Sequence, residues 1–220
     1  MKINKLYILA IGSLFMVSCG TESSEETAPE SAPLKKSTEQ VCTYAYDSSS
    51  TKLSWTSFKT TDKIAVSGTF NTYTVDNTVE SNSESAVFEN ASFTIVTNSV
   101  NSGNEHRDPK IITFFFNTLI STDTISGHIV KISEALDGKG EAIVAFTMNE
   151  ITHEQVTSYT LMADVLTLST TLNMDNWDAN GGIQALNTEC KVLHTGADGI
   201  SKLWNEVEVE ISTTLSKVCE

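Results

Sequence analysis

Residues 203–215 read LWNEVEVEISTTL. Apolar and acidic side chains alternate through the middle of this segment, so Val207, Val209 and Ile211 share one face of an extended strand and the glutamates share the other. A helix would distribute the same glutamates around its circumference. One face of this strand must therefore be buried and the other solvated, as in an antiparallel sheet.

The same period-two alternation recurs through the chain from Cys42 onward, between clusters of Ser, Asn, Asp and Gly. This repetition predicts an all-β domain, and a set of about eight antiparallel strands has the size of a small barrel. We therefore expect an eight-stranded antiparallel closed barrel. The expected strands span residues 52–58, 64–75, 91–96, 111–120, 124–132, 141–151, 159–172 and 203–215.

Two of these strands contain a change of apolar phase, one near Asn71 and the other after Val165. Such a change predicts a bulge, and bulges help a sheet to curl. A third strand is unusual because residues 111–116 are apolar on both faces. We expect another element to cover its outer side.

The candidate cover is a helix in the C-terminal part of the chain. Apolar residues recur at spacings of three and four between Ile183 and Leu193, which predicts about three helical turns ending at Gly196. Cys190 belongs to this apolar stripe.

Composition limits the partners of this chain. Its 220 residues include 28 acidic and 14 basic side chains, for a formal net charge of -14. A chain without a basic field does not bind phosphate backbones, so we exclude nucleic acid as a partner. The length is enough for one domain with a single core.

The amino terminus has the pattern of a lipoprotein signal peptide, which we expect to span residues 1–18. Lys2 and Lys5 precede an apolar run that is shorter than the roughly 20 residues of a membrane-spanning helix. The order Met-Val-Ser-Cys at 16–19 resembles a bacterial lipobox, which implies cleavage before Cys19 and lipidation of that residue. We therefore expect attachment to the membrane through Cys19.

Residues 19–41 follow as an acidic tether rich in Ser, Thr, Glu and Pro, a composition that cannot bury enough apolar area to fold. The folded domain is then expected to span residues 42–220. This organisation predicts an outer-membrane lipoprotein of the bacterial cell envelope that faces the periplasm or the cell surface.

Three cysteines remain after Cys19, and an oxidising compartment predicts one disulfide and one free thiol. We favour Cys42 with Cys219, because the first and last strands of a closed antiparallel barrel lie side by side. Cys190 is the alternative partner for either residue, or a buried thiol on the expected helix.

No catalytic, metal-binding or cofactor-binding pattern is found in the sequence. The four histidines, His106, His128, His153 and His194, lack the spacing of metal ligands, and no GxSxG nucleophile motif is present. We therefore expect no enzyme activity, no metal and no cofactor.

Arg107 is the only arginine in the chain, and Asp108 follows it. Because every other basic residue of the chain is a lysine, an arginine at this position indicates a planar, bidentate contact. Two readings are open. Arg107 clamps Asp108 or another carboxylate and anchors the loop 101–109, or it contacts the anion of a ligand.

Three short motifs carry a resemblance to a known family. They are Trp55 to Phe58, the VSGTF sequence at 66–70 (V-x-G-x-F), and residues 99–108, which are similar to S-x-x-T-G-N-x-x-R-D. In this order, over roughly residues 44–216, they resemble the YceI-like family of periplasmic, lipocalin-like barrels associated with polyisoprenoid binding. At 166–169 the chain departs from the family pattern, because LTLS stands where members often carry a leucine-threonine run followed by histidine-glycine.

The resemblance implies a non-catalytic protein that binds or carries an isoprenoid or similar long-chain amphiphile inside its barrel. The side chains expected to line the tunnel, chosen for size and strand face, are Trp55, Phe70, Phe93, Phe116, Phe146, Leu161 and Leu168. The alternative is an envelope interaction or adhesin-like module, in which the same residues fill a solid core.

Overall fold

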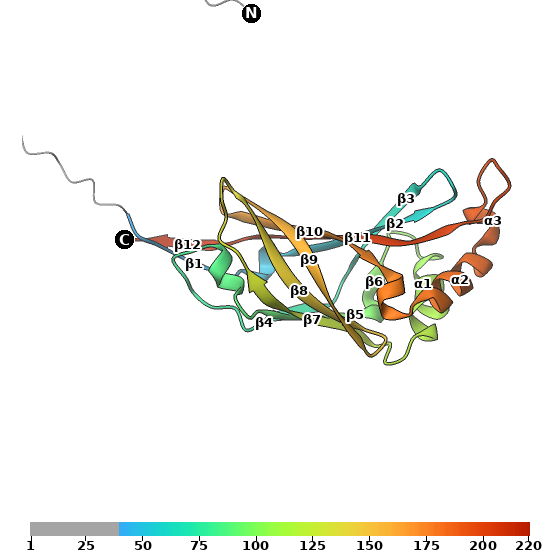
Figure 1. Ribbon diagram of the computed structural model, residues 1–220, viewed down its shortest axis with the longest axis horizontal. Coiled ribbons are helices and arrows are strands. Elements are labelled where there is room, and N and C mark those ends of the chain that lie inside the picture. Colours follow the sequence, from blue (N-terminus) through green and yellow to red (C-terminus); the bar gives the residue numbers. More distant parts are fainter. Residues whose placement is uncertain (1–39) are drawn as a thin grey trace, which may run out of the picture. The chain divides into compact units, whose positions relative to one another are not determined.

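The computed structural model describes residues 40–220, which fold mainly into antiparallel strands (Figure 1). The expected signal peptide, Cys19 and nearly all of the expected tether lie outside the described residues. No helix within residues 40–220 is both long and apolar enough to cross a membrane.

Ten strands form one sheet in the order β4-β5-β7-β8-β9-β10-β11-β2-β3-β6, which curls strongly into a half-barrel (Figure 1). The strands are β2 (Lys52–Lys59), β3 (Ile64–Phe70), β4 (Tyr73–Asp76), β5 (Ser92–Val96), β6 (Val100–Asn101), β7 (Thr124–Ile132), β8 (Lys139–Met148), β9 (Ile151–Met162), β10 (Val165–Asn173) and β11 (Leu203–Thr214). Five 3-10 helices connect them: η1 (Ser48–Ser50), η2 (Ser85–Phe88), η3 (Thr97–Ser99), η4 (Phe116–Thr118) and η5 (Met174–Trp177).

The expected closed barrel of eight strands is wrong. The strand expected at 64–75 is broken at Asn71 and Thr72 into β3 and β4, and η3 separates β5 from β6. The two breaks bond to each other outside the regular ladder: the Asn71 N–H donates to the Ser99 carbonyl (2.9 Å) and the Val96 N–H to the Thr72 carbonyl (3.0 Å). The irregularity expected near Asn71 therefore exists, but it interrupts the sheet.

The single strand expected at 159–172 is also wrong. Ala163 and Asp164 both have positive φ, 49° and 66°, and the chain reverses there. Two consecutive residues with positive φ form a tight hairpin turn. Val165 consequently lies opposite Met162. The change of apolar phase after Val165 therefore reflects the start of a new strand after a turn, and not a bulge within one strand.

The strand expected at 111–120 does not exist, because this segment is mainly helical. Pro109 stands in the first turn of α1 (Asp108–Phe114), where its missing N–H costs no hydrogen bond, and η4 follows. An apolar run without clear periodicity fits a buried strand and a buried helix equally well.

The expected C-terminal helix is confirmed as α2 (Asn180–Glu189) and α3 (Lys191–His194), with Cys190 between them. α2 packs against α1. The expected cover over residues 111–116 is therefore present, although these residues do not form a strand. The three helices gather at one end of the curled sheet (Figure 1).

The opposite end of the sheet carries a separate two-stranded ribbon of β1 (Cys42–Ala45) and β12 (Ser216–Cys219) (Figure 1). Cys42 lies directly opposite Cys219, and the two form a disulfide. The expected pairing is confirmed, although its setting is this ribbon and not a closed barrel. Cys190 is a buried free thiol, so the pairings that involved it are wrong.

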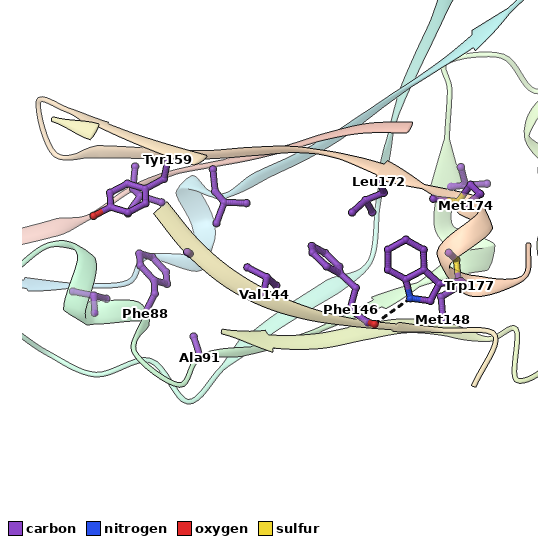
Figure 2. Close-up of a cluster of buried hydrophobic side chains, with 14 of the residues drawn as sticks. Phe88, Ala91, Val144, Phe146, Met148, Tyr159, Leu172, Met174 and Trp177 are labelled. Atoms are coloured by element: carbon purple, nitrogen blue, oxygen red, sulfur yellow. Dashed lines mark hydrogen bonds between the residues drawn. The ribbon is translucent and has the colours of Figure 1, made fainter. Parts of the chain in front are cut away.

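The core runs along the inner face of the sheet, from Tyr159 near the ribbon to Trp177 near the helices (Figure 2). Both side chains are almost completely buried. On β11, Val207 and Val209 face this interior while Glu208 and Glu210 are exposed. The expected alternation is therefore confirmed from Val207 to Glu210, whereas the register shifts between Leu203 and Val207.

Candidate functional site

An apolar cavity of about 140 Å³, here called the inner cavity, lies near the helical end of the sheet. β2, β3, β8 and β11 supply one part of its wall, and α1, α2, η4 and η5 supply another. Its lining side chains are almost all aliphatic, aromatic or methionine. This space is suited to a hydrocarbon group, because such surface gains free energy when it leaves water.

Two tryptophans contribute to the wall, and both satisfy their indole N–H elsewhere. Trp177 Nε1 donates to the Phe146 carbonyl at 3.1 Å, which Figure 2 shows as a dashed line. Trp55 Nε1 donates to the Thr69 carbonyl at 3.2 Å. Their rings therefore present carbon surface to the cavity without an unpaired donor.

Gly68 explains why the VSGTF motif contains a glycine. It lies opposite Trp55 in the β2–β3 ladder. A Cβ atom at this position would overlap the Trp55 ring and lie 2.7 Å from the Asn101 carbonyl oxygen. Only glycine lets the indole lie against β3, so this residue shapes the cavity wall through a close approach.

A second, smaller apolar space of about 70 Å³ lies further along the interior, here called the distal cavity. Phe146 is the one residue that lines both spaces. Its ring centroid lies 5.4 Å from that of Phe93 and 6.4 Å from that of Trp177. The Phe146 ring therefore stands between the two cavities.

Six of the seven residues expected to line a tunnel are found at these cavities. Trp55, Phe70 and Phe116 line the inner cavity, Phe93 and Leu168 line the distal cavity, and Phe146 lines both. Leu161 is partly buried against the core and lines neither.

Sequence reasoning missed the part of the inner cavity that the helices supply. Ile183 and Leu186 of α2 line it, together with Met174 and Trp177 of η5. The apolar stripe of α2 predicts a cover on the outer side of the sheet, whereas in the structure two of its residues line the inner cavity. No periodic signal marks η5, because one 3-10 turn is too short to have one.

A pocket of about 300 Å³, here called the basic pocket, adjoins the inner cavity. The two share five lining residues, Trp55, Ser57, Ile111, Leu186 and Leu203. The titratable side chains that line the pocket are Lys59, His106, Arg107, Lys110, Cys190 and His194. Arg107 therefore lies at a space that shares part of its wall with the inner cavity.

Asp108, which the sequence suggests as a loop anchor together with Arg107, bonds to Ser102 at the beginning of the loop. Its Oδ1 accepts hydrogen bonds from the Ser102 backbone N–H (2.9 Å) and hydroxyl (2.5 Å). Within residues 40–220, Arg107 forms no ion pair with Asp108 or with any other carboxylate. The same residues contain no cluster of three or more potential metal ligands.

His194 is buried at this end of the molecule, with 9% of its surface exposed. Its Nδ1 donates to the Asn187 side-chain oxygen at 3.0 Å. Burial, helped by the positive charge of Lys59, lowers the pKa of His194 from 6.5 to about 4. The ring is therefore neutral at pH 7.

Acid is expected to destabilise the fold through His194. Between pH 6.5 and about 4 the unfolded chain binds a proton that the folded chain excludes, so the free energy of unfolding falls as pH falls through this window. The loss reaches about 3 kcal/mol at the acidic end. Equilibrium denaturation at several pH values measures it.

The matched control for this prediction is His194→Asn, which cannot take up the proton. Carboxylates contribute equally to both proteins, so the wild type should lose about 3 kcal/mol more than the variant across the window. Parallel pH profiles for the two proteins would contradict the role of His194.

Comparison with known proteins matches residues 44–215 to the sequence model of the YceI-like domain. No curated protein matches the chain. Among solved structures, a polyisoprenoid-binding domain from Saccharophagus degradans implicated in plant cell wall breakdown is 12% identical, with a TM-score of 0.54 over 83% of this chain and 100% of that one.

Two further structures share the fold. BcnA from Burkholderia cenocepacia is 12% identical, with a TM-score of 0.53 over 79% of this chain and 99% of that chain. The YceI protein of Campylobacter jejuni is 16% identical, with a TM-score of 0.50 over 70% of this chain and 85% of that chain. At these identities the likeness is one of fold.

Proposed function

The chain belongs to the YceI-like domain family, as its motifs predicted, and we propose that its interior binds the hydrocarbon tail of a polyisoprenoid or similar long-chain amphiphile without catalysis. The observation that carries the proposal is the inner cavity of about 140 Å³ with its almost entirely apolar wall. The alternative of a solid interaction module has less support, because the interior contains two separate spaces.

Hydrocarbon burial supplies the free energy of binding in this proposal. Each methylene group that leaves water for an apolar wall contributes about 0.8 kcal/mol. Because Trp55 and Trp177 already donate their indole N–H groups to backbone carbonyls, the wall offers a tail few polar contacts. Selection among ligands then depends on the length and shape of the tail more than on hydrogen bonds.

The solved structures add a second line of support. The Saccharophagus degradans domain, which has the same fold, is described as polyisoprenoid-binding. A prenyl tail is therefore the first ligand class to test. Its branched, flexible chain suits a space bounded by both aromatic rings and aliphatic side chains.

We also propose that the protein is a lipoprotein of the bacterial cell envelope, attached to the membrane through acyl chains on Cys19. The support is the sequence pattern of residues 1–19: two lysines, a short apolar run and a lipobox-like Met-Val-Ser-Cys. Residues 20–41 would then serve as the tether between the anchor and the domain.

Blocking the inner cavity is expected to abolish binding of a prenyl tail. Val207 faces the inner cavity from β11, so Val207→Trp places an indole in a space of only about 140 Å³. Native mass spectrometry with geranylgeraniol, a neutral prenyl alcohol, should show a complex for the wild type and none for the variant. Overpacking of this kind costs roughly 1–3 kcal/mol of stability, so the variant should remain folded.

The control variant places the same side chain on the outer face of the same strand. Glu208 is exposed, and Glu208→Trp should bind geranylgeraniol as the wild type does. Circular dichroism verifies that both variants are folded. Equal binding by the wild type and Val207→Trp would contradict the proposed site.

A further inference from the structure

The basic pocket has a charge opposite to that of the chain as a whole. The chain has 28 acidic and 14 basic side chains, but no Asp or Glu lines this pocket. Lys59 comes from the end of β2, whereas Arg107 and Lys110 come from the start of α1. Residues far apart in the sequence therefore bring three cationic groups to one place.

Two of these three cations have no carboxylate partner within the described part of the chain. Lys110 Nζ lies 2.9 Å from Glu189 Oε1, whereas neither Lys59 nor Arg107 forms an ion pair in residues 40–220. Both side chains are half-buried, which makes an unpaired charge more costly than at an open surface. An anion in the pocket would supply the missing partner.

The electrostatics of neighbouring groups agree with this arrangement. Burial, helped by the negative charge of Glu189, raises the pKa of the Cys190 thiol, while the positive charges of Lys110, Lys59 and Arg107 act in the opposite direction. Lys59 also contributes to the lowered pKa of His194. The three cations thus act on the same small volume of the molecule.

We propose that the basic pocket binds the phosphate or diphosphate head of a prenyl lipid whose tail occupies the inner cavity. This inference rests on the proposed function and adds the class of headgroup to it. Trp55, Ile111 and Leu186 line both spaces, so the basic pocket lies directly beside the inner cavity, where the head of an amphiphile with its tail in that cavity would be placed.

The residue types fit a phosphate group. The guanidinium of Arg107 is planar and permanently charged, and it can donate two parallel hydrogen bonds to phosphate oxygens. Lys59 adds a compact positive charge at the same pocket. Within this inference, the second reading of Arg107, a ligand-anion contact, replaces the clamp to Asp108.

The experiment compares ligands with one tail and different heads. Dissociation constants are measured for geranylgeraniol, geranylgeranyl phosphate and inorganic diphosphate with the wild type, Arg107→Gln, Lys59→Gln and Lys131→Gln. Lys131 is exposed on β7 and does not line the pocket, so its variant controls for the loss of one charge. Thermal unfolding verifies that each variant is folded.

The wild type should bind the lipid phosphate at least about tenfold more tightly than the alcohol, as expected for a charge-assisted hydrogen bond. Arg107→Gln and Lys59→Gln should each remove about tenfold of the affinity for the phosphate and leave the alcohol unchanged. Lys131→Gln should change neither. Added salt should weaken binding of the phosphate alone.

Other outcomes separate this inference from the proposed function. Equal affinity for alcohol and phosphate in the wild type would overturn the headgroup assignment and leave the tail site standing. Inorganic diphosphate bound as tightly as the lipid phosphate would overturn the assignment to a lipid head. Binding of neither lipid would overturn both proposals.

Discussion

Replacing Cys42 and Cys219 together with serine is expected to lower the free energy of unfolding by about 5 kcal/mol. The disulfide joins residues 177 positions apart, so it closes nearly the whole domain into one loop. Without this link the unfolded chain gains the conformational entropy of an open chain, while the folded state loses only a contact at the terminal ribbon. Equilibrium denaturation of the oxidised wild type and the double variant measures the difference.

Cys190→Ala is the control for this prediction. Cys190 is buried but unbonded, so its replacement should cost no more than about 1–2 kcal/mol. Reduced wild type should unfold at the same denaturant concentration as the double variant. A loss below about 2 kcal/mol in the double variant would contradict the entropic account.

Phe146→Ala is expected to destabilise the domain by about 3–5 kcal/mol and to merge the two cavities. The ring is 4% exposed and stands between the inner and distal cavities, in contact with Phe93 and Trp177. Its removal opens a path along the interior. A longer prenyl alcohol such as solanesol should then gain affinity relative to geranylgeraniol, by about tenfold for every two additional methylenes buried.

Phe88→Ala is the matched control, because Phe88 is also buried but lines the distal cavity alone. Both variants should lose stability in denaturant unfolding, whereas only Phe146→Ala should change the preference for tail length in native mass spectrometry. An unchanged preference in Phe146→Ala would show that the ring does not limit the tail.

Local patterns in the sequence predicted the strands and helix that have clear periodicity. The alternation around Val207 and Val209 placed their inward face correctly, and the spacing from Ile183 to Leu193 identified a helix. Two segments failed for identifiable reasons. The run at 111–120 has no distinguishing period, and the turn at Ala163 and Asp164 contains no glycine to mark it.

The candidate site was predicted in part. The aromatic residues of the inner face, such as Trp55 and Phe70, could be chosen because strand parity says which side chains point inward. Parity cannot say whether those side chains fill the interior or leave a space, since this depends on how far the sheet curls and on where η5 and α2 pack. For this reason the sequence does not predict that Trp177 lines the inner cavity.

The amino-acid order alone established an acidic, mainly β domain, its inward and outward faces and its family. These features follow from short-range periodicity, from composition and from motifs, which are properties of neighbouring residues. The broken sheet, the two cavities and the placement of Lys59 and Arg107 at one pocket arise from packing between distant segments. Such contacts depend on the strand order and on the curl of the sheet, which no local pattern encodes.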